Sequence, residues 1–238
     1  MPRADGRGPQ QLRPVEMIQD YVKFAEGSVL IRCGDTVVLC NASVEEKTPP
    51  HVKEGCGWVT AEYSMLPRAN RQRSRRDIDK LKLAGRSAEI QRLIGRSLRA
   101  AVDMEKLGAH TITVDCDVLQ GDGGTRTASV TGGFVAIALA CRRLVEQGVL
   151  AENPVRHYVA GVSAGIVDDE LLLDLPYSED SRAQVDLNCV MNERGELIEL
   201  QGTGEGRSFT IEEQQALVTL CRSGIRQLIE KQREIVAL

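Results

Sequence analysis

The chain has 238 residues, 42% of them hydrophobic and 27% charged, so it can bury a full core in one domain or in two closely packed lobes. Its formal net charge of −4 at pH 7 argues against a protein devoted to nonspecific nucleic-acid binding. No run reaches the roughly 18 to 20 apolar residues of a membrane span, and the polar start lacks the apolar core of a signal peptide. We therefore expect a cytoplasmic protein with no membrane partner.

The cysteines and histidines indicate neither a disulfide framework nor a zinc site. The seven cysteines are odd in number and scattered, without a Cys-x-x-Cys pair, so buried free thiols are expected. The three histidines stand apart from one another in the sequence. Chemistry based on histidine is therefore not expected.

Alternating apolar side chains predict an antiparallel sheet in the first part of the chain, with strands at 15–24, 28–33, 36–44 and 58–63. Gly34 and Asp35 suit a tight two-residue turn between the second and third of these strands. Residues 66–82 lack periodicity and predict a long solvated loop.

Two helices and a strand are expected next. Apolar residues recur at helical spacing from 88 to 102, and Ser87 is the predicted N-cap. The alternating strand 111–119 turns its apolar side chains to one face and its aspartates to the other. A buried helix is expected over 128–146.

The second part of the chain predicts two hairpins and a final helix. Strands 158–167 and 170–175 flank the turn Asp168-Asp169, and strands 184–191 and 196–201 follow. Thr210 and Glu213 form a capping box before an amphipathic helix. This order predicts a single α+β domain with mixed or antiparallel sheets and two similar lobes, about 10–150 and 155–238.

A glycine-rich loop, Gly121–Thr127, joins the strand 111–119 to the following helix. Glycines before a helix start expose backbone N–H groups at the positive end of the helix dipole, where an anion is favoured. Arg126 adds a fork that suits phosphate oxygens. The loop lacks the lysine of a P-loop and the G-x-G-x-x-G spacing of a dinucleotide turn. Taken alone, it is more easily explained as a simple turn.

Two aspartates form a second candidate site. Asp180 lies in a predicted turn, and Asp186 lies on a strand where it shares the polar face with Asn188. Two carboxylates brought together across a turn can hold a hard divalent cation that bridges to phosphate. Taken alone, a solvated acidic turn is the simpler explanation.

An arginine-rich loop is the third feature, with residues Arg68, Arg71, Arg73, Arg75 and Arg76. This loop can hold a polyanion although the whole chain is acidic. No serine, histidine or cysteine nucleophile is evident. The combination favours a reaction in which the nucleophile, such as inorganic phosphate, arrives as a substrate.

Several stretches resemble the RNase PH family, namely 3–7, 11–14, 25–28, 85–99, 115–127 and 177–188. They occur in order over nearly the whole chain. The chain is too short for polynucleotide phosphorylase, which carries two such cores and further RNA-binding domains. The resemblance implies the fold of the second domain of ribosomal protein S5 and a ring-shaped homohexamer built from dimers.

The resemblance also implies a function: phosphate-dependent 3′-to-5′ trimming of tRNA precursors and other structured RNA, with release of nucleoside diphosphates and a reverse reaction that adds nucleotides. Phosphate would be bound by Arg86, Gly124, Thr125 and Arg126. Asp180 and Asp186 would be catalytic and would bind Mg²⁺, or Mn²⁺. The arginine-rich loop would grip the body of the tRNA.

One alternative from another class is a catalytically silent, RNA-binding ring subunit of an exosome-like assembly. Missing arginines or aspartates would favour it. This chain has Arg86, Arg126, Asp180 and Asp186 in place.

Overall fold

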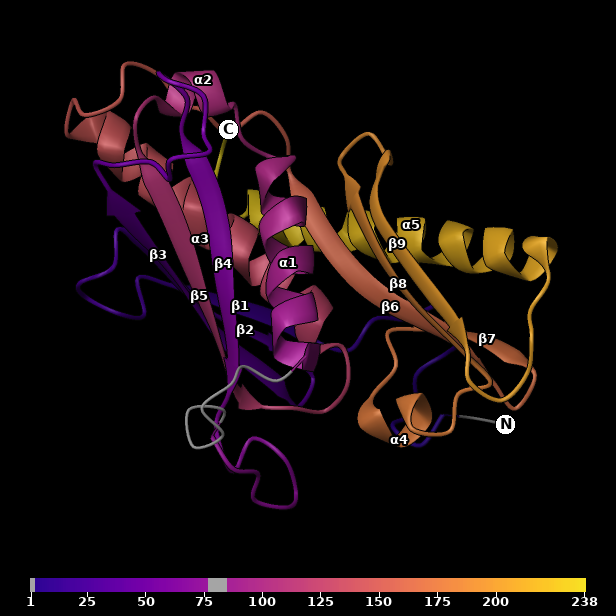
Figure 1. Cartoon of the computed structure of the whole chain (residues 1–238). Helices are drawn as coiled ribbons and strands as arrows, with labels where there is room; N and C mark the ends of the chain where they lie inside the picture. Colours follow the sequence, from indigo (N-terminus) through magenta and orange to yellow (C-terminus); the bar gives the residue numbers. More distant parts are fainter. Residues whose placement is uncertain (1–2, 77–84) are drawn as a thin grey trace.

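The computed structural model describes residues 3–76 and 85–238, which form two sheets and five helices (Figure 1). The strands are β1 (Val15–Gln19), β2 (Gly27–Cys33), β3 (Thr36–Glu45), β4 (Trp58–Met65), β5 (Thr111–Gln120), β6 (Val159–Val167), β7 (Glu170–Leu173), β8 (Val185–Asn192) and β9 (Leu197–Gly204). The helices are α1 (Gly85–Arg99), α2 (Met104–Leu107), α3 (Thr125–Glu146), α4 (Tyr177–Asp180) and α5 (Ile211–Arg233).

The two sheets follow one another along the chain. The first has the order β1-β2-β3-β5-β4, and the second has the order β7-β6-β8-β9. Only β4 and β5 pair in parallel, and every other pairing among the described strands is antiparallel. The predicted α+β fold with mixed sheets is therefore confirmed.

Helix α3 forms the centre of the core because it packs against strands of both sheets. Figure 1 shows α3 behind the first sheet and α5 behind the second, with α1 beside β4. Among the described helices, α3 is the one that is long and apolar enough to cross a membrane by length and composition alone. However, 83% of its most apolar stretch is buried inside the fold, as in the core helix of a globular protein.

Several local predictions are confirmed by the backbone and by burial. Gly34 adopts a φ of +57°, and Asp168 and Asp169 adopt +50° and +62°, as tight two-residue turns require. Thr210 and Glu213 form the predicted capping box of α5. All seven cysteines are unpaired, and all except Cys56 are buried.

Other predictions need correction. Strand β1 ends at Gln19 instead of residue 24 because Asp20, with a φ of +53°, turns the chain out of the extended conformation. Ser87 is not an N-cap, because α1 already includes Gly85 and Arg86. The one-turn helices α2 and α4 were not predicted, since four residues carry no periodic signal. Residues 77–82 of the predicted loop lie outside the described residues.

A close approach between β2 and α3 at Gly27 gives a stability prediction. A Cβ on Gly27 would lie 1.9 Å from the Ala136 oxygen and 2.7 Å from the Ala140 nitrogen, so Gly27→Ala must push the helix from the sheet. We expect the free energy of unfolding to fall by about 1 to 3 kcal/mol, measured by urea denaturation. Gly206→Ala is the control, since its Cβ would approach no atom closer than 3.5 Å. Equal stability of both variants would contradict the prediction.

Candidate functional site

The glycine-rich loop forms an open N-terminus for α3. Gly123 and Gly124 adopt φ values of +74° and +65°, a region that side chains disfavour. A Cβ on Gly123 would also lie only 2.4 Å from the Leu175 oxygen. Gly124 is the N-cap of α3, and no side chain caps the helix. The first N–H groups of α3 are therefore available to an anion.

Arg126 lies in the first turn of α3 and is held by side chains from two other elements. Its Nη1 donates a hydrogen bond to the Gln201 Oε1 and lies 3.5 Å from the Glu89 Oε1. Gln201 in turn donates from Nε2 to the same Glu89 oxygen, at 2.8 Å. Because Glu89 is in α1 and Gln201 is in β9, the guanidinium is oriented by both parts of the chain.

Thr125 is connected to the buried Tyr63 of β4. The Tyr63 hydroxyl and the Thr125 Oγ1 are 2.8 Å apart and share a hydrogen bond. Burial raises the pKa of Tyr63, while the positive charges of Arg86 and Arg126 act in the opposite direction. Tyr63 therefore remains protonated at neutral pH and orients the threonine hydroxyl beside two arginines.

The two predicted carboxylates lie close enough to influence each other. Asp180 is the last residue of α4, and Asp186 is the second residue of β8. Burial raises the pKa of Asp180, and the charges of Arg86 and Arg126 oppose that rise. Burial and then the negative charge of Asp180 raise the pKa of Asp186 to about 6. The structure thus brings the predicted phosphate-binding arginines and both aspartates to one place.

Asp186 has an unused oxygen that fits a metal ion. Its Oδ2 accepts a hydrogen bond from the Asn188 Nδ2 at 3.1 Å, but its Oδ1 is buried without a hydrogen-bond partner. Among the described residues, no group of three or more His, Cys, Asp or Glu side chains could hold a metal. A pair of carboxylates suits Mg²⁺, which usually keeps several waters and bridges to phosphate.

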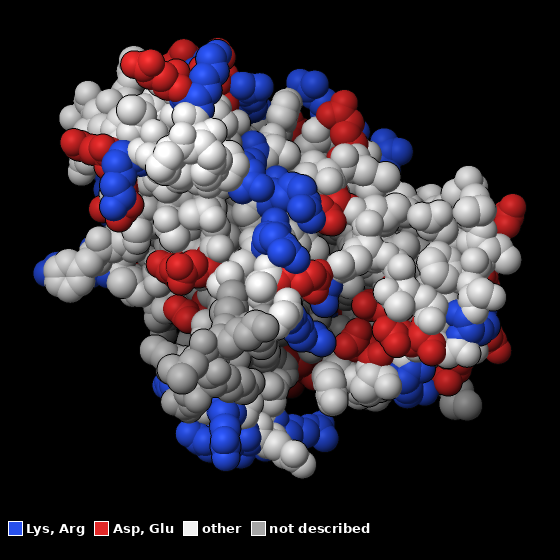
Figure 2. All heavy atoms as spheres, in the orientation of Figure 1, with Lys and Arg blue, Asp and Glu red and all other residues white. Residues whose placement is uncertain are grey.

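The arginine-rich loop begins next to the glycine-rich loop. The Gly121 N–H donates to the Ala69 oxygen at 2.9 Å. Figure 2 shows basic side chains gathered at the tip of the segment that follows β4. The five predicted RNA-binding arginines are all exposed, and none forms an ion pair with another described residue. They are Arg68, Arg71, Arg73, Arg75 and Arg76.

Comparison with known proteins identifies the family. The model of domain 1 of the 3′ exoribonuclease family matches residues 11–142, and that of domain 2 matches residues 157–220. The chain belongs to the 3′ exoribonuclease family. It is 54% identical to Ribonuclease PH of Moorella thermoacetica, over 99% of this chain and 95% of that protein. It is 52% identical to Ribonuclease PH of Bacillus subtilis, over 98% of this chain and 96% of that protein.

A solved structure of the Archaeoglobus fulgidus exosome with RNA bound to the active site is also similar to this exoribonuclease. The identity is 26%, with a TM-score of 0.83, and the match covers 96% of this chain and 92% of that chain. Together these relatives confirm the predicted RNase PH fold, with its likeness to the second domain of ribosomal protein S5. The family models and the curated relatives also confirm the predicted 3′ exoribonuclease activity.

The sequence analysis missed residues that support this exoribonuclease's site. Arg13 is buried, donates to the Asp122 oxygen, and its charge counteracts the rise in the pKa of Asp180 caused by burial. Glu205, after β9, contributes to raising the pKa of both Asp180 and Asp186. The stretch 11–14 contributed to the family resemblance, but nothing in its local pattern shows a contact with a loop more than 100 residues away.

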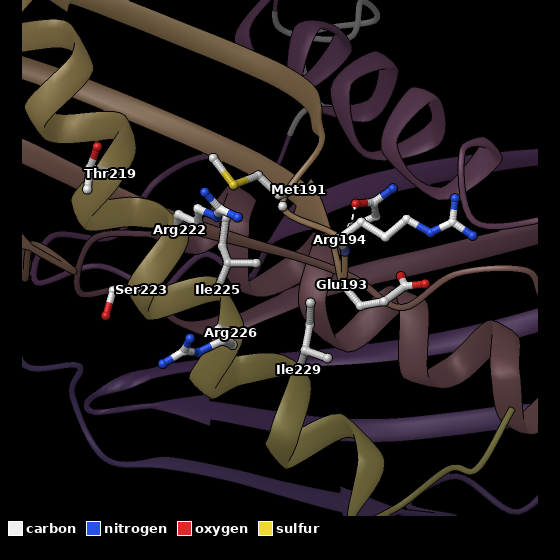
Figure 3. Close-up of a pocket in the computed structure, with 11 residues that line it drawn as sticks. Met191, Glu193, Arg194, Thr219, Arg222, Ser223, Ile225, Arg226 and Ile229 are labelled. Atoms are coloured by element: carbon white, nitrogen blue, oxygen red, sulfur yellow. Dashed lines mark hydrogen bonds between the residues drawn. The ribbon is translucent and has the colours of Figure 1, made fainter.

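A separate cavity lies between α5 and the turn that joins β8 and β9 (Figure 3). Its volume is about 260 Å³, and Met191 and Ile225 contribute apolar walls. No predicted site residue lines it. Met191 lies five residues beyond Asp186 along β8, or roughly 16 Å in an extended strand. The cavity is therefore not part of the candidate site.

Proposed function

We propose that inorganic phosphate binds at the N-terminus of α3, between Arg86 and Arg126, and attacks the last phosphodiester of an RNA. The observation that carries this proposal is the uncapped start of α3, where Arg126 lies in the first turn and the preceding loop contacts α4: the Tyr177 N–H donates to the Asp122 Oδ1 at 3.3 Å. The charges of Arg86 and Arg126 also oppose the rise in the pKa of Asp180. Guanidinium forks and free backbone N–H groups favour phosphate over a neutral ligand. The Thr125 hydroxyl, oriented by Tyr63, adds one more hydrogen-bonding group.

In the proposed reaction an oxygen of hydrogen phosphate forms a bond to the terminal phosphorus, and the bond from that phosphorus to the preceding 3′ oxygen breaks. The leaving oxygen takes up the proton carried by hydrogen phosphate. The products are a nucleoside diphosphate and an RNA one nucleotide shorter with a free 3′ hydroxyl. Because both substrates are anions, the arginines contribute mainly by positioning them and reducing their repulsion.

Asp180 and Asp186 are proposed to bind Mg²⁺, or Mn²⁺, in this reaction. When bound, the ion would neutralise charge that develops on the phosphate oxygens. The Oδ1 of Asp186 supports this assignment because it is buried without a hydrogen-bond partner. A bound cation would compensate for the hydrogen bond that this oxygen lacks. The pairing with Asn188 fixes the other oxygen of the same carboxylate.

The substrates, assembly and location follow from the family and are proposals here. Precursors of tRNA would contact the arginine-rich loop. The chain would form a homohexamer of three dimers, and exposed apolar side chains such as Phe24, 86% exposed, and Ile211, 64% exposed, suit such contacts. A cytoplasmic location agrees with seven unpaired cysteines.

The decisive experiment is incubation of the protein with a 3′-labelled RNA, with and without phosphate. Release of nucleoside diphosphate only in the presence of phosphate supports the proposed reaction. Release of monophosphate would mean hydrolysis. No release would favour the silent ring subunit.

Arg126→Ala tests the phosphate site. We expect the KM for phosphate to rise about tenfold to hundredfold, since a hydrogen bond to a charged group contributes about 1.5 to 3 kcal/mol. Arg126→Lys should show a smaller rise because it keeps the charge but loses the fork. Arg142→Ala is the control, because Arg142 lies on the same helix and, among the described residues, its only ion pair is with Glu146. An unchanged KM in Arg126→Ala would refute the assignment.

Asp180→Asn and Asp186→Asn test the metal site. A bound cation stabilises the transition state by several kcal/mol, so we expect kcat to fall about a hundredfold or more in each variant. RNA binding, measured by fluorescence anisotropy, should persist. Asp20→Asn is the control. Asp20 is exposed in the loop between β1 and β2, and asparagine tolerates the positive φ of this position. Full activity of either site variant would exclude its proposed role.

The arginine-rich loop is tested by the salt dependence of tRNA affinity. In the triple variant Arg71→Gln, Arg73→Gln, Arg75→Gln, we expect the slope of log affinity against log salt to fall by about three, one for each lost phosphate contact. The kcat on short single-stranded RNA should stay unchanged. A control of equal charge is a triple glutamine variant at the distant cavity, at Arg194, Arg222 and Arg226. Parallel losses of tRNA binding and short-RNA turnover would contradict the proposed role.

A further inference from the structure

The N-terminal segment, residues 3–14, contains no helix or strand, yet two of its arginines are buried. Arg3 is 6% exposed and Arg13 is 5% exposed. Burying a guanidinium is costly unless charged partners and hydrogen bonds compensate. The partners of these two arginines therefore identify what the segment holds in place.

Arg3 forms hydrogen bonds with α4 and with residues that precede this helix. Its Nε and Nη2 donate to the two carboxylate oxygens of Glu179, at 3.0 and 2.6 Å, in a bidentate pair. Its Nη1 donates to the Leu173 oxygen at 2.8 Å, and Nη2 also reaches the Asp174 oxygen at 3.0 Å. Glu179 is itself only 4% exposed. The fork geometry fixes both the position and the orientation of this carboxylate.

Helix α4 needs such support. A helix of four residues, Tyr177–Asp180, cannot be stable by itself, since nucleating a turn is unfavourable. Glu179 and Asp180 are consecutive residues on this turn, so their side chains point in different directions. One is buried against Arg3, while the other lies in the field of Arg86 and Arg126. Holding Glu179 therefore fixes the direction of Asp180.

The second buried arginine, Arg13, holds the glycine-rich loop in a similar way, through a carboxylate and a backbone oxygen. Arg13 binds the Asp174 carboxylate through its backbone N–H, Nε and Nη2, and it donates from Nη1 to the Asp122 oxygen. Thr36 adds a hydrogen bond from Oγ1 to the Gly123 oxygen, at 2.7 Å. Arg13 thus supports the glycine-rich loop, and Arg3 supports α4.

We propose that Arg3, acting through Glu179, is a positioning residue that fixes Asp180 where it can share a divalent cation with Asp186. This inference rests on the proposed function. If the Arg3–Glu179 pair were purely structural, its loss would lower folding stability and thereby reduce all activities together. If the pair positions Asp180, its loss reduces metal binding selectively, because Arg86, Arg126 and the glycine-rich loop are proposed to hold phosphate independently of Glu179.

The test is the double variant Arg3→Met, Glu179→Gln, which removes both charges so that neither remains buried alone. Mn²⁺ binding is measured by electron paramagnetic resonance in the presence of inorganic phosphate. We expect Mn²⁺ affinity to fall about tenfold to hundredfold, as when support of a metal ligand is lost. The kcat should fall at low metal concentration and recover at high metal concentration. The KM for phosphate and the RNA affinity should not change.

The matched control is the double variant Arg182→Met, Asp168→Asn. It removes an ion pair of 2.6 Å from the same region, but both side chains are more than half exposed. We expect its Mn²⁺ affinity and kcat to equal those of the parent. Arg3→Lys is a second test, because it keeps the charge but loses the fork. It should bind Mn²⁺ more weakly than the parent, and it decides the question if the double variant does not fold.

Two results would overturn the inference. One is an unchanged Mn²⁺ affinity in a folded Arg3 variant. The other is a loss of metal binding, phosphate use and RNA binding that follows the melting temperature in parallel. A parent protein that releases no nucleoside diphosphate would instead refute the proposed function, whatever the Mn²⁺ measurements give.

Discussion

The buried ion pair between Arg13 and Asp174 is the contact on which the rest of the site depends. The Arg13 Nη2 lies 2.6 Å from the Asp174 Oδ1, and both residues are less than 10% exposed. Burial favours the neutral form of Asp174, but Arg13 outweighs that effect and holds the pKa of Asp174 below its usual value. Removing one partner of such a pair typically costs about 3 to 5 kcal/mol, because a charge is left buried alone. This pair connects the segment that precedes β1 of the first sheet with the segment that follows β7 of the second sheet.

This connection explains how two parts of the chain build one site. The glycine-rich loop follows β5 of the first sheet, whereas Asp180 and Asp186 lie around the start of β8 in the second. No hydrogen bond between strands joins the two sheets among the described residues. The relative position of the glycine-rich loop and the two carboxylates therefore depends on α3, which packs against both sheets, and on the N-terminal segment, which contacts both loops.

The sequence was a good guide wherever a feature repeats locally. Period-two and helical patterns predicted every strand and the three long helices of the described residues, and the burial of Ile112, Val114 and Val118 matches the predicted face of β5. The glycine-rich loop and both aspartates were also recognised, although their proximity required the family resemblance. The contacts of Arg3 with Glu179, 176 residues apart, were not predictable, since an ion pair formed by distant segments leaves no local pattern. The hydrogen bond between Tyr63 and Thr125 also joins distant segments and was not predictable. The one-turn helix α4 was missed because four residues carry no periodic pattern.

The environment of Arg126 fixes the orientation of its guanidinium in advance, which suits the proposed phosphate site. A free arginine loses much side-chain entropy when it binds, which weakens the interaction. Here the neutral Gln201 takes a hydrogen bond from the guanidinium, while the carboxylate of Glu89 remains at 3.5 Å, longer than a strong charged hydrogen bond. Glu89 itself accepts a hydrogen bond from Gln201, which keeps it in that position. The guanidinium is thus held in place without being fully neutralised, so its charge remains available to the proposed phosphate dianion.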